Sequence, residues 1–174
     1  MPHTIEPAAG GRAKCRGCKQ AIAKGELRFG ERLPNPFADG EMTIWFHLDC
    51  AALRRPESFM EIVDTDAATI PAAERSRLVD MAEAGRRHHR LARIAGAERA
   101  PSARARCRAC RQVIARDDWR IVLEIFEEGM FNPAGYLHPG CASAYFGTSG
   151  ILERIVRFSP LDPADMADME ALIE

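Results

Sequence analysis

One set of metal-ligand residue types occurs twice in this chain at nearly the same spacing. Each set is a Cys-x2-Cys pair followed, after 28 residues in the first set and 27 in the second, by His-x2-Cys. The sets are Cys15, Cys18, His47 and Cys50, and Cys107, Cys110, His138 and Cys141. A Cys-x2-Cys turn presents two thiolates on one side of the chain, at a separation that suits two corners of a tetrahedron. The sequence therefore predicts two closed Cys3His sites, each holding one structural Zn²⁺ ion with no open position for a catalytic water.

The two sets use all six cysteines of the chain. In a reducing compartment these cysteines should not form disulfides, so we interpret them as metal ligands. The alternative is a group of buried free thiols, which would rarely fall into two complete sets. Units of about 70 residues bury little apolar area, so the metal should supply much of the stability of each unit. We expect the metal-free protein to be largely unfolded.

The length of 174 residues suits one ordinary domain or two small ones and excludes a large multidomain enzyme. No stretch approaches the roughly 20 apolar residues of a membrane span, and the first residues lack the apolar core of a secretory signal. We therefore expect an intracellular protein with no membrane partner, found in the cytoplasm or nucleoid of a prokaryote or in the nucleus of a eukaryote. We expect it to be a monomer when free.

The repeat extends beyond the ligands and divides the chain. At an offset of 92 residues, GRAKCRGC matches ARARCRAC, and IWFHLDC matches GYLHPGC at an offset of 91. Such self-similarity is the signature of a tandem duplication. We expect a first finger with its C-terminal helix at residues 10–85, a basic linker at 86–103, and a second finger with its C-terminal helix at 104–174.

Each finger is expected to be a small α+β domain. Strands are predicted at 26–33 and 43–49 in finger one and at 119–127 and 136–138 in finger two, with a turn-rich segment between each pair. Short helices are predicted at 51–55 and 142–146, and longer ones begin near Pro71 and Pro163. The apolar stripes expected to face the core are Leu78, Met81 and Ala82, and Met166, Met169, Leu172 and Ile173. The predicted fold is two zinc-stabilised domains in tandem, each a short antiparallel sheet with flanking helices.

Charge is distributed unevenly along the chain, although the formal net charge is only −1. Residues 85–120 hold 11 basic and 3 acidic side chains, whereas residues 121–174 hold 2 basic and 9 acidic ones. The basic segment could follow a phosphate backbone, although charge runs are usually solvated faces. The acidic end of finger two favours a protein partner instead.

Several motifs around the two ligand sets point to a known family. In finger one they are Arg12-Ala13-Lys14-Cys15, Leu27-Arg28, the Pro36-Phe37 loop with Asp39-Gly40, and Trp45-Phe46-His47. In finger two they are Tyr136-Leu137-His138-Pro139-Gly140-Cys141 and Phe158-Ser159-x-Leu161. These motifs resemble the zinc finger of the poly(ADP-ribose) polymerase family. The resemblance implies a two-finger array that recognises DNA strand breaks, in which arginines grip the duplex backbone and an apolar loop tip covers exposed bases.

Carried over position by position, the resemblance implies two kinds of DNA-contacting residue. The backbone-gripping arginines are Arg12 and Arg28 in finger one and Arg104 and Arg120 in finger two; the base-stacking residues are Phe37 and Met42, with Met130 and Phe131 as their counterparts. Each arginine pair lies three residues before and ten residues after its Cys-x2-Cys turn, so both should lie beside the zinc and clamp phosphate. The alternative is a structural arginine that pairs with an acid. Glu127 and Glu128 at the second tip should repel phosphate, which favours weak DNA binding or a partner protein.

The sequence thus predicts a zinc-dependent, non-enzymatic protein that binds nicks, gaps or ends in DNA without sequence readout. A DNA repair enzyme is a further expected partner. The sequence contains no apparent glycine-rich phosphate loop, nucleophile with a base, or paired carboxylate cleft. Two alternatives stay open: an adaptor that uses zinc only to scaffold a protein-binding surface, and a binder of single strands or RNA that uses the same stacking residues.

Overall fold

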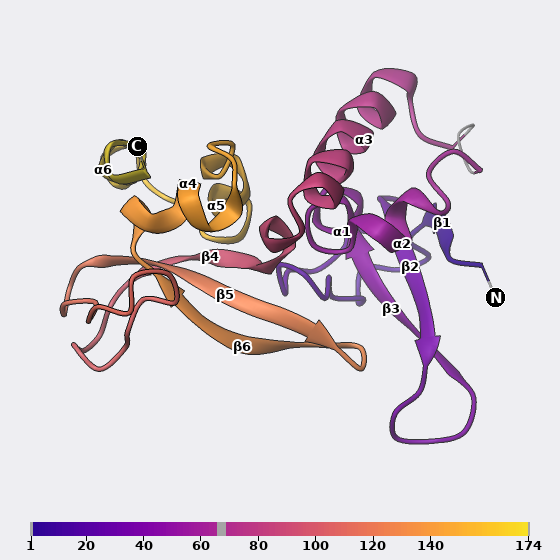
Figure 1. Cartoon of the computed structure of the whole chain (residues 1–174). Coiled ribbons are helices and arrows are strands. Elements are labelled where there is room, and N and C mark those ends of the chain that lie inside the picture. Colours follow the sequence, from indigo (N-terminus) through magenta and orange to yellow (C-terminus); the bar gives the residue numbers. More distant parts are fainter. Residues whose placement is uncertain (1, 66–68, 174) are drawn as a thin grey trace. The chain divides into compact units, whose positions relative to one another are not determined.

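The computed structural model describes residues 2–65 and 69–173. The chain divides into two compact units, one formed by Met1–Arg87 with Phe126–Met130 and the other by His88–Ile125 with Phe131–Glu174. In the described residues each unit contains a three-stranded antiparallel sheet with helices packed against it (Figure 1). The small α+β fold with tandem Cys3His groups is therefore as the sequence predicts.

In the first unit the sheet is ordered β1-β2-β3 and is followed by three helices. The elements are β1 (Thr4–Pro7), β2 (Leu27–Pro34), β3 (Glu41–His47), α1 (Leu48–Arg54), α2 (Pro56–Met60) and α3 (Ala72–Arg87). Side chains alternate across a strand, so Phe29 of β2 and its register partner Phe46 of β3 share one face of the sheet. Both are fully buried, and the ring of Phe59 on α2 packs edge-on against Phe29 at 5.8 Å between centroids. This aromatic cluster is the centre of the first core.

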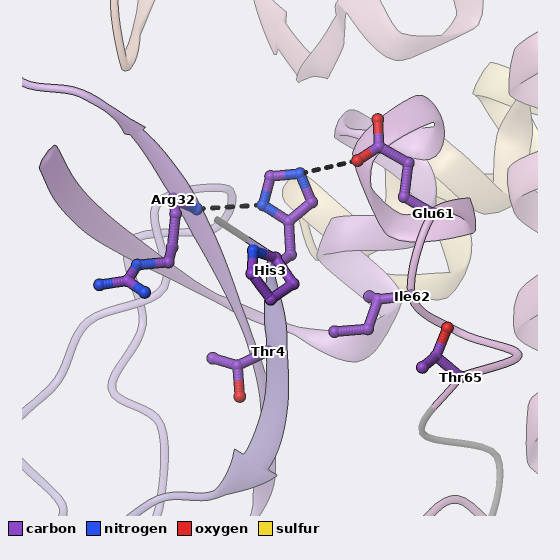
Figure 2. A pocket seen from close by; sticks show the side chains of 7 residues that line it. His3, Thr4, Arg32, Glu61, Ile62 and Thr65 are labelled. Carbon is purple, nitrogen blue, oxygen red and sulfur yellow. Dashed lines mark hydrogen bonds and ion pairs between the residues drawn. The ribbon is translucent and has the colours of Figure 1, made fainter.

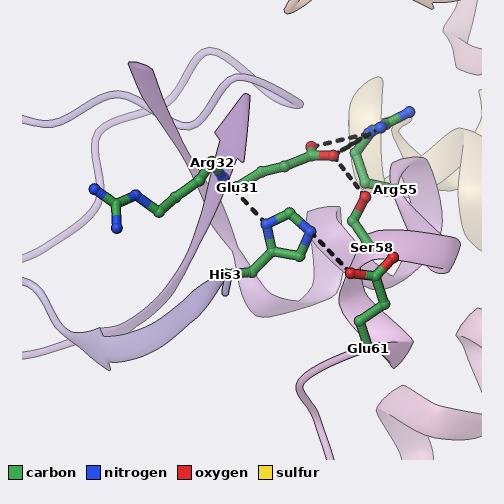
Figure 3. A network of polar contacts seen from close by, with 6 residues as sticks. All are labelled: His3, Glu31, Arg32, Arg55, Ser58 and Glu61. Atoms are coloured by element: carbon green, nitrogen blue, oxygen red, sulfur yellow. Dashed lines mark hydrogen bonds and ion pairs between the residues drawn. The ribbon is translucent and has the colours of Figure 1, made fainter. Parts of the chain in front are cut away.

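The same inner face carries a buried carboxylate, Glu31, that joins β2 to α2 (Figure 3). Arg55 donates to its two oxygens from Nε at 2.9 Å and from Nη2 at 2.7 Å, and the Ser58 hydroxyl donates at 2.6 Å. A buried charge is tolerated when a partner charge and further hydrogen bonds satisfy it. Glu31 therefore fixes the position of α2 on the sheet.

His3 attaches the start of β1 to the rest of the unit (Figure 2). The backbone N–H of Arg32 donates to His3 Nδ1 at 3.1 Å, and His3 Nε2 lies 3.2 Å from a carboxylate oxygen of Glu61. The imidazole borders a cavity of about 470 Å³. Because both ring nitrogens already have protein partners, we interpret His3 as an anchor for β1. The strand that it anchors lies directly beside β2.

The second unit repeats this plan with the sheet order β4-β5-β6. Its elements are η1 (His89–Arg93), β4 (Ile94–Arg99), β5 (Trp119–Glu127), β6 (Met130–Leu137), η2 (Pro139–Cys141), α4 (Ala142–Phe146), α5 (Leu152–Phe158) and α6 (Pro163–Ile173). Helix α5 packs on β4, and α6 packs on η2. Fully buried aliphatic side chains, including Ile121, Leu137 and Ile155, fill this core.

The segment expected as a basic linker, 86–103, holds the end of α3, η1 and β4 in the structure. Strand β4 pairs antiparallel with β5, and Ile94 is fully buried. The corresponding strand β1 likewise lies before residue 10, where the first finger was expected to begin. Both are short strands whose pairing is with residues far along the chain, so little in their local sequence marks them.

The second hairpin differs from expectation at its tip. Strand β5 covers 119–127 as predicted, but β6 begins at Met130 instead of Tyr136, which leaves Glu128 and Gly129 as a two-residue turn. Their φ angles of 50° and 79° suit a tight hairpin turn that needs left-handed residues. Pro133 lies in β6, an edge strand, where a residue without an N–H group is tolerated. The extended loop that the sequence suggested is therefore a strand.

The apolar stripes of the long helices are only partly core. Leu78, Ala82, Met169 and Ile173 are buried as predicted. Met166 and Leu172 on α6 are 36% and 46% exposed, so for them the prediction was wrong. No helix in the described ranges is long and apolar enough to cross a membrane.

Candidate zinc centres and nucleic-acid interface

Each Cys-x2-Cys segment folds into a tight turn with the same backbone geometry. The N–H of Lys19 donates to the carbonyl of Cys15 at 2.9 Å, and the N–H of Arg111 donates to that of Cys107 at the same distance. Lys19 and Arg111 have φ angles of 65° and 66°, in the left-handed region. This reversal aims both thiols of each turn in one direction, so the turn is ready to receive a metal ion.

Two groups of four ligand residues assemble among the described residues. They are Cys15, Cys18, His47 and Cys50, and Cys107, Cys110, His138 and Cys141. Within each group the ligand atoms lie within 4.8 Å of one another. Zinc–ligand bonds of about 2.0–2.3 Å place the corners of a tetrahedron about 3.3–3.8 Å apart, so a small contraction around the ion completes each site. The donor chemistry and the geometry fit two structural Zn²⁺ ions, as the sequence predicts.

Outer contacts orient the histidine of each site. His47 Nδ1 lies 3.3 Å from Cys18 Sγ, while its Nε2 lies 3.2 Å from the carbonyl of Ala21. The second site repeats this arrangement: His138 Nδ1 is 3.3 Å from Cys110 Sγ, and its Nε2 is 3.3 Å from the carbonyl of Val113. When the carbonyl accepts a hydrogen bond from Nε2–H, the lone pair of Nδ1 is left for the metal. Nδ1 is therefore the ligand atom in both sites.

The first cysteine of each site favours the thiolate form that zinc binds. A hydrogen bond from Cys50 lowers the pKa of Cys15 to about 4, against the opposing effect of burial. Burial also works to raise the pKa of Cys107, but hydrogen bonds from the backbone N–H groups of Cys110 and His138 outweigh it and lower that pKa to about 6. Thiolates are the metal-binding form of cysteine, so one thiol in each site is prepared for a cation. Burial raises the pKa of Cys18 in the first site and, with the neighbouring thiols, the pKa of Cys141 in the second.

The two centres differ in their exposure to solvent. In the first, Cys15, His47 and Cys50 are buried and Cys18 is half-buried. In the second only Cys107 is buried, and Cys110 is exposed. The ligands of the second site are therefore more accessible to solvent than those of the first.

Arg28 lies beside the first zinc site but is held within the protein. Its Cα pairs with that of His47 on β3 and with that of Glu6 on β1, so these three side chains share the outer face of the sheet. Arg28 Nη2 donates to the Glu6 carboxylate at 2.9 Å, and its guanidinium lies 3.6 Å from the centre of the Trp45 ring. Only 12% of the Arg28 side chain is exposed. The predicted phosphate ligand is thus covered by a ring and paired with an acid.

Gly30 makes the stacking of Trp45 possible. It lies opposite Trp45 on the central strand. A Cβ atom on Gly30 would come within 2.7 Å of Trp45 Cζ3 and 2.8 Å of Thr4 Cγ2. The missing side chain therefore leaves the space through which the indole reaches Arg28.

Finger two repeats the arrangement of acid, arginine and ring. Glu98 of β4 is the register partner of Arg120 on β5, and Nε and Nη2 of Arg120 both donate to one Glu98 oxygen. The Arg120 guanidinium lies 3.6 Å from the centre of the Tyr136 ring, and 8% of its side chain is exposed. Neither glutamate was among the residues predicted from the sequence to contact DNA or metal. Extending the repeat upstream would have found the pair, since Glu6 and Glu98 also lie 92 residues apart.

The other arginines and the apolar residues predicted to contact DNA lie at different ends of each hairpin. Arg12 and Arg104 are exposed on the segments that precede the cysteine turns. Phe37 is 79% exposed on the loop between β2 and β3, where its N–H donates to the Asn35 side chain at 2.9 Å. Six residues separate Arg28 from the end of β2, which is about 20 Å along an extended strand. The zinc end therefore carries the basic groups and the far end carries the apolar tip.

The remaining apolar residues predicted to stack on bases are less exposed than Phe37. Met42 is half-buried in β3, opposite Leu33. Met130 is 41% exposed and Phe131 is half-buried, at the start of β6. Finger two therefore presents its apolar pair on a strand next to a tight turn, without a protruding loop.

The fold and the two donor sets define a class of protein, a tandem of Cys3His zinc fingers. Residues 6–79 match the family described as the poly(ADP-ribose) polymerase and DNA-ligase zinc-finger region. Residues 6–79 thus form a zinc finger of the poly(ADP-ribose) polymerase type, and a second Cys3His group follows this finger in the chain.

Similarity to larger proteins extends over the whole chain. It is 28% identical, over 98% of its length, to a poly(ADP-ribose) polymerase from Sarcophaga peregrina, and 30% identical, over 73% of its length, to one from Drosophila melanogaster. It is 26% identical, over its full length, to a polynucleotide 3'-phosphatase from Arabidopsis thaliana. The chain spans 19%, 14% and 28% of these relatives, respectively. The family that matches is a zinc-finger region, which is a binding module.

Proposed function

We propose that this chain binds DNA at strand breaks through its zinc fingers, without reading sequence and without catalysing a reaction itself. The observation that supports this most is the exposure of Phe37 at the end of a hairpin. A large apolar side chain on an exposed loop costs solubility unless a partner covers it. Unpaired or unstacked bases at a break offer a flat apolar surface that suits a phenyl ring. A duplex with continuous stacking offers no such face.

Phosphate contacts complete the proposed interface. Arg12 and Arg104 are exposed beside the cysteine turns, where a guanidinium can bind phosphate through two hydrogen bonds. Arg28 and Arg120 lie on the adjacent sheet faces. Phosphates occur on every duplex, so these contacts give affinity without selectivity. The names of the relatives agree with this proposal, since one is a polynucleotide 3'-phosphatase. A protein with this function would be located with cellular DNA, in the nucleoid of a prokaryote or the nucleus of a eukaryote.

We assign the selectivity for breaks mainly to finger one. Its hairpin ends in a loop that exposes Phe37, with Met42 close behind it on β3. The hairpin of finger two ends in a tight turn that follows Glu127 and contains Glu128, and these two carboxylates would repel phosphate. Met130 and Phe131 would make the smaller apolar contribution of that finger. A repair enzyme recruited to the break is the partner that such a protein would serve.

The test is a competition among nicked duplex, intact duplex, single strand and RNA of equal length for the zinc-loaded chain. We expect nicked duplex to be preferred. Phe37→Ala should reduce the ratio of nicked to intact binding by about 5- to 150-fold, equivalent to the 1–3 kcal/mol of one stacked base. Leu172→Ala is the matched control, because Leu172 is an exposed apolar residue on α6. It should leave the ratio unchanged.

Other outcomes would redirect the proposal. Preference for single strand or RNA would support a single-strand binder that uses the same ring. Absence of binding to all four nucleic acids would support an adaptor that docks a protein, for which the partly exposed Met166 and Leu172 of α6 offer an apolar surface. Unchanged selectivity in a folded, zinc-loaded Phe37→Ala protein would show that the tip does not recognise breaks.

A further inference from the structure

We propose that Glu6 and Glu98 compete with DNA phosphate for Arg28 and Arg120, and so limit how tightly each finger holds the DNA backbone. This inference rests on the proposed DNA binding and adds to it two residues of opposite charge. Both glutamates lie on the edge strand next to the arginine, β1 in one unit and β4 in the other. The effect is a weakening of backbone contacts on every kind of duplex.

The first support is that the same arrangement occurs in both halves of the duplication. Glu6 and Glu98 occupy equivalent positions, as do Arg28 and Arg120. In each finger the carboxylate binds the guanidinium through Nη2, and an aromatic ring covers one guanidinium face at 3.6 Å. The ring is an indole in one finger and a phenol in the other. The arrangement thus persists although the residues around it differ.

The second support is the relative exposure of acid and base. The side chains of Glu6 and Glu98 are 43% and 48% exposed, whereas those of Arg28 and Arg120 are 12% and 8% exposed. In each pair the carboxylate is therefore the more accessible group, and most of the guanidinium is covered. Each pair has no net charge, so a phosphate gains little Coulomb attraction from it. To bind Nη2, the phosphate must displace the carboxylate oxygen already there.

A purely structural role makes the opposite prediction. If the glutamates only fasten the edge strands to the sheets, removing their charge should loosen the fingers and weaken DNA binding. If they compete with phosphate, removing the charge should strengthen binding. Glutamine separates these cases, because its side-chain oxygen can still accept a hydrogen bond from the arginine while the negative charge is gone.

The experiment compares the full chain, zinc-loaded, with Glu6→Gln, Glu98→Gln and the double variant on nicked and intact duplex over a series of salt concentrations. Each substitution should tighten binding by about two- to fivefold at low salt, the range of a solvent-exposed charge interaction. Each freed arginine should also steepen the slope of log K against log salt by up to about 0.9. Glu57→Gln is the matched control, because Glu57 is an exposed acid on α2 that pairs with Arg86. Glu57→Gln changes the net charge by the same amount, but at a position that is not on the outer face of the sheet.

A second comparison tests whether the gain in DNA affinity depends on Arg28. In an Arg28→Ala background, Glu6→Gln should give no gain in affinity beyond that of the Glu57→Gln control. Zinc content and melting temperature establish that each protein is folded. If the glutamine variants lose zinc, Glu6→Asp and Glu98→Asp replace them. Their shorter side chains withdraw the carboxylate from the arginine, and they should give a smaller gain in the same direction.

Unchanged or weaker binding by folded glutamine or aspartate variants would overturn the competition, as would an equal gain from Glu57→Gln. The proposed DNA binding would survive those results if the wild-type chain still prefers a nick. A wild-type chain that binds no DNA form at any salt concentration would overturn both proposals.

Discussion

The zinc affinity of each finger should depend on how well the core of that same finger is packed. The Phe29→Ala substitution tests this dependence in finger one. The Phe29 ring is fully buried, with the rings of His3, Phe46 and Phe59 at 5.7–6.2 Å between centroids. Removing such a ring costs about 3–5 kcal/mol, the sum of lost burial and the cavity left behind. If the metal-free finger is unfolded, zinc binding and folding are one equilibrium, so this whole cost appears in the zinc affinity. The first site should therefore bind zinc roughly 100- to 4,000-fold more weakly.

The assay is a competition with a chelator of known affinity, in which the release of the two ions is followed separately. The matched variant is Ile121→Ala, which removes a fully buried side chain at the equivalent position of β5. It should weaken the second site by about 2–5 kcal/mol and leave the first unchanged. Equal loss at both sites in either variant would show that the units do not fold separately. An unchanged first site in Phe29→Ala would show that the metal-free finger is already folded.

Two further predictions concern the metal and the exposed arginines. Elemental analysis should give two zinc ions per chain. A chelator should remove the ion at Cys107, Cys110, His138 and Cys141 first, because that site is more exposed. Simultaneous release of both ions would contradict this order. Arg12→Ala and Arg104→Ala should each lower affinity for nicked and intact duplex alike and reduce the salt slope by about 0.9; an unchanged slope would remove that arginine from the interface.

The sequence predicted the metal centres and the hairpins beside them because their signals are local. The ligand spacing specifies which residue types meet, and the strand at 119–127 agrees with the observed β5. The predicted strands 26–33 and 43–49 overlap β2 and β3 with shifts of one or two residues. Helix α4 falls on the predicted 142–146. In each case the pattern lies within a few residues of the element it defines.

What the sequence did not reveal depends on contacts between distant segments. Strand β1 has four residues, and its assignment rests on pairing with residues of β2 that lie 20 to 26 positions further along the chain. Glu31 is an acid on the core face of β2, and only the positions of Arg55 and Ser58 explain its burial. Similarly, nothing local indicates which acid pairs with Arg28. The interface predicted from the sequence therefore included the arginines but not the glutamates that pair with them.

The duplication separates what a finger of this kind needs for folding from what it needs for recognition. The cysteine turns, the histidine carbonyl contacts and the pairing of Glu, Arg and ring agree in both units, because each is tied to the zinc ligands or to the central strand. The hairpin ends are not tied to these features: residues 35–40 form a loop between β2 and β3, whereas Glu128 and Gly129 alone join β5 to β6. A tip that is free to differ can specialise for a partner. For this reason we assign break recognition to the loop that carries Phe37 and backbone binding to the zinc ends of both fingers.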